Sequence, residues 1–117
     1  MANGFYSYFI NNLLKSTTTV IDFDTVTLKW VLTDHGTDTP NLTTDDFLND
    51  ISTGTIATSS SLSSVTVGVV ADGVIDAADA SPAFTAVSGS SCESLSLYED
   101  SGSAATSDLI CYFDTAT

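Results

Sequence analysis

Alternation of apolar and polar residues predicts one β-strand clearly. In the segment 25–33, TVTLKWVLT, every second side chain is large and apolar. The apolar set is Val26, Leu28, Trp30 and Leu32, and the intervening set is Thr25, Thr27, Lys29 and the less polar Val31. Successive side chains of a strand point to opposite faces, so we expect one face on the core and the other nearer to solvent.

A helical period is present near the start of the chain. The apolar residues that recur at this spacing are Phe5, Tyr6, Phe9, Ile10, Leu13 and Leu14. Asn3 can cap the helix, and the β-branched run 17–21 disfavours its continuation, so the pattern predicts a helix over residues 3–16. A helix lying on a membrane surface usually carries several basic residues, whereas this one has only Lys15. We therefore expect its apolar face to pack against a sheet or a partner subunit.

A loop and a short helix follow the strand. The loop, DHGTDTPN, is rich in turn-forming residues, and the next segment, TTDDFLNDI, has the pattern of a short helix. Thr44 is its expected cap, and Asp45 and Asp46 fall in its first turn, where carboxylates are favourable. Phe47, Leu48 and Ile51 are expected to point inward.

The second half of the chain is rich in Ser, Thr, Ala, Gly and Val and predicts a series of strands. The strand-like runs are SVTVGVV, PAFTAV, SLSLYE and LICYFD. The serine-rich stretch before Val65 also reads as strand, and the alternation from Val65 to Val69 predicts one buried face. The predicted fold is therefore mainly β within the α+β class: an antiparallel sheet or sandwich with an N-terminal amphipathic helix and one short helix, in a single domain spanning residues 1–117.

Composition narrows the possible partners. The chain has 117 residues, is 43% hydrophobic, and carries a formal charge of -13 because only Lys15 and Lys29 oppose 15 acidic residues. The apolar content is enough for a folded core, whereas nucleic acid and anionic membrane surfaces should repel the protein. No signal peptide or membrane-spanning segment is evident, so the chain is expected to be soluble and not exported by the standard route.

Three acids, Asp72, Asp76 and Asp79, lie close together in the segment DGVIDAADA and invite comparison with a calcium loop. An EF-hand needs oxygen ligands at alternate positions, Gly at the sixth and Glu at the twelfth. The acids here fall at positions 1, 5 and 8 of the segment, and the Asp72-Gly73 pair is ordinary tight-turn chemistry. A turn is the preferred interpretation, and no metal site is predicted.

His35 is the single histidine and lies between Asp34 and Asp38, an arrangement that resembles a general base with its orienting carboxylate. A nucleophile would still be needed, and no serine lies in a G-x-S-x-G motif. Nucleotide-binding glycine motifs are also absent. We expect a loop histidine, no catalytic residues, no cofactor and no enzyme activity.

Cys92 and Cys111 lie nearly symmetrically about the turn-like segment EDSGSAATSD. A hairpin joining the last two predicted strands could bring the two cysteines nearly opposite each other. A cross-strand disulfide is therefore one alternative. Buried free thiols are the default in a reducing cytosol.

Several segments together resemble a family of small virion structural proteins of tailed bacteriophages. In chain order they are MANGFYSYFINNLLK, VTLKWVLTD, TPNLTTDDFLNDI, DGVIDAADA, FTAVSG and SLYEDSGSAATSDLICYFDT. The resemblance covers nearly the whole chain and rests on the order of these segments, since none is a catalytic signature. Family members continue past the equivalent of YFDTAT into a glycine-containing turn and a terminal strand, and their turn at ASPAF is shorter.

The resemblance implies a non-enzymatic capsid decoration or cement protein that binds the major capsid protein. Such a protein is made in the host cytoplasm, is held on the capsid surface of the virion, and is expected to self-associate. We expect its contacts on the helix face formed by Phe5, Phe9 and Leu13. A neck or tail position in the virion is the alternative, and a glycan-binding module that uses Trp30 and Tyr98 ranks below both because alternation puts Trp30 on the core face.

Overall fold

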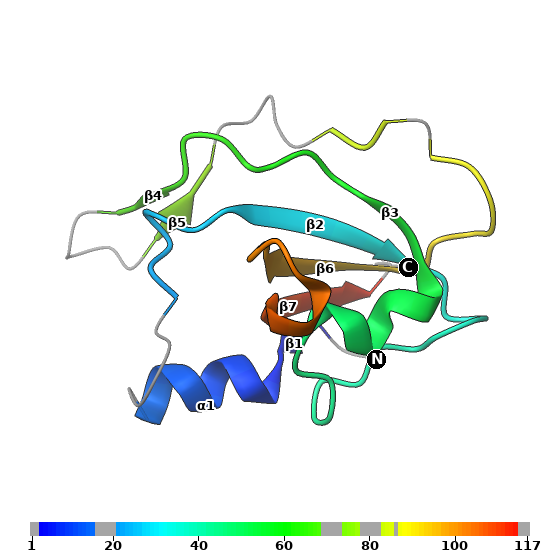
Figure 1. Cartoon of the computed structure of the whole chain (residues 1–117), viewed down its shortest axis with the longest axis horizontal. Helices are drawn as coiled ribbons and strands as arrows, with labels where there is room; N and C mark the ends of the chain where they lie inside the picture. Colours follow the sequence, from blue (N-terminus) through cyan, green and yellow to red (C-terminus); the bar gives the residue numbers. More distant parts are fainter. Residues whose placement is uncertain (1–2, 16–20, 69–73, 78–82, 86, 115–117) are drawn as a thin grey trace.

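A five-stranded antiparallel sheet, with strand order β1-β7-β6-β2-β3, organises the chain (Figure 1). The computed structural model describes residues 3–15, 21–68, 74–77, 83–85 and 87–114. The strands of the sheet are β1 (Gly4–Phe5), β2 (Leu28–Thr33), β3 (Thr55–Thr58), β6 (Ser94–Glu99) and β7 (Leu109–Asp114). A second, two-stranded sheet pairs β4 (Thr66–Val67) with β5 (Ile75–Asp76), and the helices are α1 (Ser7–Lys15) and the 3₁₀ helices η1 (Leu48–Gly54) and η2 (Ala104–Thr106). The predicted class, α+β and mainly β with an antiparallel sheet, is confirmed.

The three strongest strand predictions are confirmed, two of them with their bounds. SLSLYE is β6 and LICYFD is β7, and they pair as neighbours. β2 lies beside β6 but begins at Leu28 rather than Thr25. The preceding residues form a turn instead, in which the amide of Val26 donates to the carbonyl of Asp22 at 3.0 Å.

Both faces of β2 are covered, which corrects the expectation of a core face and a solvent face. Val31, expected on the more polar face, is fully buried, as is Thr33 two positions on, whereas Trp30 on the expected core face is only half-buried. The register explains the burial, because Val31 lies opposite Ser96 on the face that also holds Ile51 of η1. Alternation identified the strand but not which face would be more enclosed.

The enclosed face of the sheet carries the better-sealed core. Its buried members are Tyr6, Val31, Ile51, Tyr98, Leu109 and Tyr112, with Leu42 and Leu48 packed against them. The Tyr6 hydroxyl and Ser96 Oγ are hydrogen-bonded at 2.9 Å within this core. Small serines of β6 thus face the densest part of the molecule, while its leucines face the other way.

A second cluster occupies the opposite face of the sheet, toward α1. Its buried members are Phe9, Ile21, Leu28, Ile110 and Cys111. Phe9 attaches α1 to the sheet, with its ring 6.0 Å from that of Phe23. In Figure 1, α1 and the β4–β5 pair lie on either side of the end of the sheet where β2 begins.

The N-terminal helix is shorter than predicted. It begins at Ser7, because Gly4 and Phe5 pair with β7 as strand β1. Asn3 does not cap it, and its Oδ1 accepts a hydrogen bond from the Asp114 amide at 2.8 Å instead. Gly4 and Phe5 thus form backbone hydrogen bonds with the β7 edge, which they could not form within a helix.

The short helix also begins later than predicted and has 3₁₀ geometry. Its start is fixed by Asp50, whose Oδ2 accepts hydrogen bonds from the amides of Asp46 and Phe47 at 2.9 and 3.0 Å. Thr44 is not the cap, and lies in a preceding turn where its hydroxyl contacts Asp45. Ile51 is fully buried as expected, because η1 covers the enclosed face of the sheet.

The serine- and valine-rich middle of the chain forms less regular strand than predicted. β4 is two residues long and Val67 is 45% exposed, so the expected buried face is wrong there. Residues 83–85 of PAFTAV form no strand. The stretch from Ser59 to Leu62 is not a strand either, although it lies beside β2. The Leu62 amide donates a hydrogen bond to the Leu28 carbonyl at 2.8 Å. Val69 lies outside the described residues.

The two cysteines are free and are separated by the strand register. Cys111 lies opposite Leu97, so Cys92 is five positions away along the chain. At ~3.3 Å per residue, that offset is about 16 Å, well beyond disulfide reach. Cys111 is a buried free thiol as expected, whereas Cys92 is only half-buried. The opposed positions that were left open do not occur, because the hairpin turns later than the symmetric sequence indicates.

Candidate functional site

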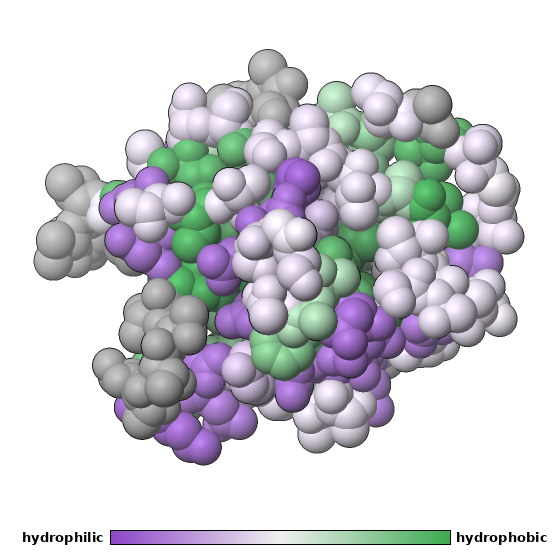
Figure 2. Space-filling model, viewed as in Figure 1, coloured by the Kyte–Doolittle hydropathy of each residue, from purple (hydrophilic) through white to green (hydrophobic). Residues whose placement is uncertain are grey.

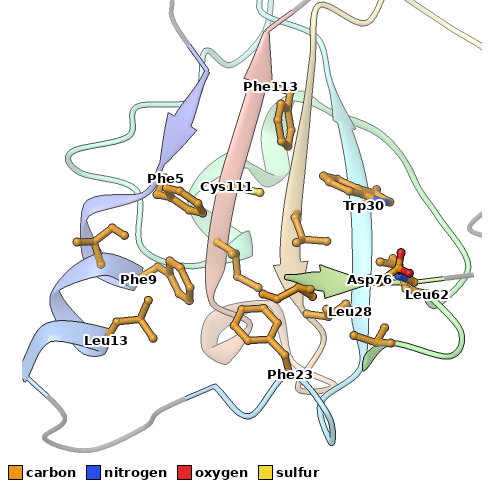
Figure 3. Close-up of a pocket in the computed structure, with 16 residues that line it drawn as sticks. Phe5, Phe9, Leu13, Phe23, Leu28, Trp30, Leu62, Asp76, Cys111 and Phe113 are labelled. Atoms are coloured by element: carbon orange, nitrogen blue, oxygen red, sulfur yellow. The ribbon is translucent and has the colours of Figure 1, made fainter. Parts of the chain in front are cut away.

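An open apolar groove of about 600 Å³ lies between α1, the sheet and the β4–β5 region (Figure 3). Its described lining residues are Phe5, Phe9, Ile10, Leu13, Phe23, Leu28, Trp30, Leu62, Val65, Ile75, Asp76, Ala77, Leu97, Ile110, Cys111 and Phe113. Asp76 is the one member of this set with a charged side chain. The volume falls within the range of protein ligand sites.

The groove exists because the larger apolar side chains of the sheet face away from the enclosed core. Leu28, Leu97 and Cys111, from three adjacent strands, form its floor. α1 is short and meets this face mainly through Phe9, so it covers only one side. In Figure 3, Phe9 and Leu13 project from α1 toward the sheet, while Trp30 and Leu62 lie on the opposite side.

The structure brings together the three residues predicted as contacts, because Phe5, Phe9 and Leu13 all line the groove. They differ in accessibility: Phe5 is 57% exposed and Leu13 is 42% exposed, whereas Phe9 is 4% exposed. Phe9 therefore forms part of the wall, and the other two are open to a partner. Leu14, next along the helix, is 79% exposed and does not line the groove.

Two smaller hollows share the lining residue Phe113 with the groove. One, of about 230 Å³, is lined by Leu32, Cys92, Ser94, Leu95, Phe113 and Asp114. The other, of about 240 Å³, is lined by Asn3, Gly4, Phe5, Cys111, Tyr112 and Phe113. Phe113 is 41% exposed, and its ring meets that of Trp30 edge-on at 5.8 Å. We call the groove together with these two hollows the apolar track.

The charges around the apolar track are nearly all acidic. Asp76 lines its groove, Asp114 lines one hollow, and Asp22 and Asp24 flank the lining residue Phe23 in the sequence. Lys29 lies between two lining residues of β2, but it pairs with Asp100, and this hydrogen bond raises the pKa of Lys29 and lowers that of Asp100. Figure 2 shows hydrophobic surface between the β4–β5 pair and α1, with hydrophilic residues beside it.

Of the acidic segment DGVIDAADA, the structure describes only residues 74–77. Asp76 is exposed in β5, and its Oδ1 accepts a hydrogen bond from the Ala77 amide at 2.9 Å. Asp72, Gly73 and Asp79 fall outside the described residues. Across the described ranges, no group of three or more His, Cys, Asp or Glu side chains is arranged to hold a metal ion.

His35 has a partner that the sequence did not identify. Its Nε2 lies 2.8 Å from Ser94 Oγ and 3.2 Å from the Tyr112 hydroxyl, and its ring stacks on that of Tyr112. The backbone amide of His35 donates to Glu93 Oε2 at 2.9 Å. A serine hydroxyl beside a histidine nitrogen has the outline of a nucleophile and its base.

The surroundings of His35 indicate a structural hydrogen-bond junction. Ser94 is 4% exposed, and it shares the same histidine nitrogen with Tyr112. Asp34, one of the two acids that flank His35 in the sequence, accepts hydrogen bonds from the Gly36 amide and the Thr37 hydroxyl. The junction joins the end of β2 to β6 and β7 and leaves the hydroxyl little access to a substrate.

The sequence did not identify most of the groove. Four of its lining residues lie in segments that are distant in the sequence, and only the tertiary fold brings them to one surface. They are Phe23, Leu62, Ile75 and Phe113. One signal was available, because the leucines of SLSLYE alternate with serines and mark one apolar face. Tyr98, considered for glycan stacking, is 3% exposed and belongs to the enclosed core.

Comparison with known proteins gave no match to a family model, to a curated protein or to a solved structure. Within the described part of the chain, the helices are too short or too polar to cross a bilayer. The geometry of the apolar track is therefore the basis for a functional proposal.

Proposed function

We propose that this protein is a non-enzymatic structural component of a tailed bacteriophage virion, a capsid decoration protein that binds and stabilises the shell of major capsid protein. The observation that carries the proposal is the apolar track, left open on the more apolar face of the sheet. Soluble proteins seldom expose a continuous apolar patch unless it binds something.

Three further features support a binding role. Phe5 and Leu13 combine exposure with a place on the groove wall. The Ser94 hydroxyl beside His35 is nearly inaccessible, which disfavours hydrolytic chemistry there. The strong negative charge disfavours a position against packaged DNA. The phage particle is proposed because of the resemblance to virion proteins, which covers nearly the whole chain. It rests on the order of the segments from MANGFYSYFINNLLK to SLYEDSGSAATSDLICYFDT.

The test is a cryo-EM reconstruction of purified particles that contain this protein, combined with its copy number by quantitative mass spectrometry. We expect density for the domain repeated over the capsid surface and hundreds of copies per particle. Particles stripped of the protein should lose resistance to heat, and adding the protein back should restore it. Density confined to the neck or tail, with about six or twelve copies as cyclic symmetry requires, would refute the decoration role.

A further inference from the structure

We infer that the apolar track is a docking site for a short polypeptide segment whose large apolar side chains alternate with, or are flanked by, basic residues. This inference rests on the proposed function, because it names the chemistry of the virion partner that the track would bind. It concerns the segment docked in the track and is independent of where in a particle the partner lies.

The extent of the apolar track favours a polypeptide over a small molecule. The groove measures about 600 Å³, and Phe113 also lines each of two further hollows of about 230 and 240 Å³. A small ligand would fill one hollow and leave the others open. A polypeptide can place successive side chains in all three.

The border of the apolar track points to the same class of partner. The large apolar residues Phe5, Leu13, Ile75 and Phe113 are between 41% and 57% exposed and belong to four different elements. A site built for a small apolar molecule typically buries most of that molecule within its walls. Here apolar surface continues outward from the groove, as expected for a protein interface with an apolar centre.

Charge determines which polypeptide fits. Asp76 lines the groove of the track and Asp114 lines one of its hollows, and Asp22 and Asp24 adjoin Phe23. The cation nearest in sequence to a lining residue, Lys29, is engaged by Asp100, which leaves Lys15 at the end of α1 as the other lysine of the chain. A basic segment would be attracted, whereas a second copy of this chain, also at -13, would be repelled.

Two synthetic peptides of equal length test the inference with the full-length protein. Both contain the same alternating Phe and Leu residues, and the intervening positions are Lys in one and Glu in the other. Binding is measured by fluorescence anisotropy at low salt and at 0.5 M NaCl. We expect the Lys peptide to bind at least about tenfold more tightly at low salt, a preference of about 1.4 kcal/mol, and the preference to shrink at high salt.

Adjacent leucines provide a matched pair of variants. Leu13 lines the groove and Leu14 does not, although both are exposed residues of α1. We expect Leu13→Ser to weaken binding of the Lys peptide at least about fivefold, and Leu14→Ser to leave it within about twofold. Asp76→Asn should reduce the preference for Lys over Glu, whereas Asp38→Asn, which removes a charge away from the lining residues, should not. Circular dichroism of each variant checks that it is folded.

Several results would overturn the inference. These are equal binding of the two peptides, no binding of either at millimolar concentration, or equal loss in Leu13→Ser and Leu14→Ser. Saturable uptake of the neutral dye Nile red that the Lys peptide fails to displace would instead assign the groove to a small apolar ligand. If the peptide results hold but the protein is absent from capsid surfaces, the docking site stands and the decoration role fails.

Discussion

The hydroxyl of Tyr6 and Oγ of Ser96 are hydrogen-bonded at 2.9 Å although 90 positions separate them in the chain. Both residues are fully buried, and the bond joins the segment between β1 and α1 to the middle of the sheet. Burial raises the pKa of Tyr6 far above its ordinary value. The bond therefore holds the residue that precedes α1, one wall of the groove, against the sheet.

Removing either partner of this bond should destabilise the protein. Tyr6→Phe leaves the Ser96 hydroxyl buried without its partner, and Ser96→Ala does the same to Tyr6, each at a cost of about 1 to 3 kcal/mol. The double variant should lose less than the sum of the two, because neither hydroxyl is then left alone. Urea denaturation of all four proteins measures the coupling, and strictly additive losses would contradict it.

Gly54 should not tolerate a side chain. A Cβ at this position would lie 2.7 Å from Asp38 Cβ and 3.0 Å from the Asp34 carbonyl oxygen. We expect Gly54→Ala to lower the free energy of unfolding by about 1 to 3 kcal/mol through overpacking. Thr53→Ala, at the exposed neighbouring position, is the control and should change stability little. Thermal melts of the two variants compare them, and equal midpoints would rule out the steric argument.

Asp108 should make the protein less stable near neutral pH. Burial and then the charge of Asp46 raise the pKa of the Asp108 carboxyl above its ordinary 3.8. A raised pKa means that the folded state holds the proton more tightly than the unfolded state does. Protonation of Asp108 therefore stabilises the fold; this stabilisation is fully present below pH 3.8 and is lost as pH rises through the folded pKa. Asp108→Asn should therefore be more stable than the native protein at pH 7, with the gain shrinking toward pH 4.

Urea midpoints measured from pH 4 to pH 7 test this expectation. The control is Asp22→Asn, which removes an exposed charge and should show a smaller gain. A gain for Asp108→Asn that stays constant across the pH range would count against the titration of Asp108 as its cause.

The two thiols should differ in reactivity. Burial raises the pKa of Cys111 to about 11 and also raises that of Cys92, which is more accessible. At pH 8, iodoacetamide should modify Cys92 slowly and Cys111 more slowly still, because the thiolate is the reacting form. In urea the two rates should converge, and mass spectrometry of the labelled peptides follows both. Faster labelling of Cys111 in the folded protein would contradict its placement on the groove floor.

The raised pKa of Cys111 also predicts that the protein loses stability at alkaline pH. Because the folded-state pKa of Cys111 exceeds its ordinary 9.0, its stabilising contribution is complete below pH 9 and is lost as pH rises toward 11. Cys111→Ser should show a weaker decline in urea midpoint between pH 9 and pH 11 than the native protein. Equal declines would assign the alkaline loss to other groups, such as Tyr98, whose pKa burial also raises.

The sequence by itself determined the elements with strong periodicity. SLSLYE and LICYFD became β6 and β7 with the expected bounds, because alternating or continuous apolar runs bounded by turn residues have few competing structures. The described helix, Ser7–Lys15, lies within the range that the periodicity predicted, since helical spacing is a local property. The acidic charge, from which we predict repulsion of nucleic acid and anionic membrane surfaces, is likewise a property of composition alone.

Tertiary structure alone decided which face of each element would be enclosed. The local sequence does not indicate which of the neighbours Val31 and Trp30 will be more enclosed. Val31 is buried under η1, whereas Trp30 borders the apolar track. Pairing with the β7 edge turned Gly4 and Phe5 from expected helix into strand, and the β6–β7 register separated the two cysteines. The groove has the same origin, because its walls come from distant segments, and the space between them depends on how far α1 covers the sheet.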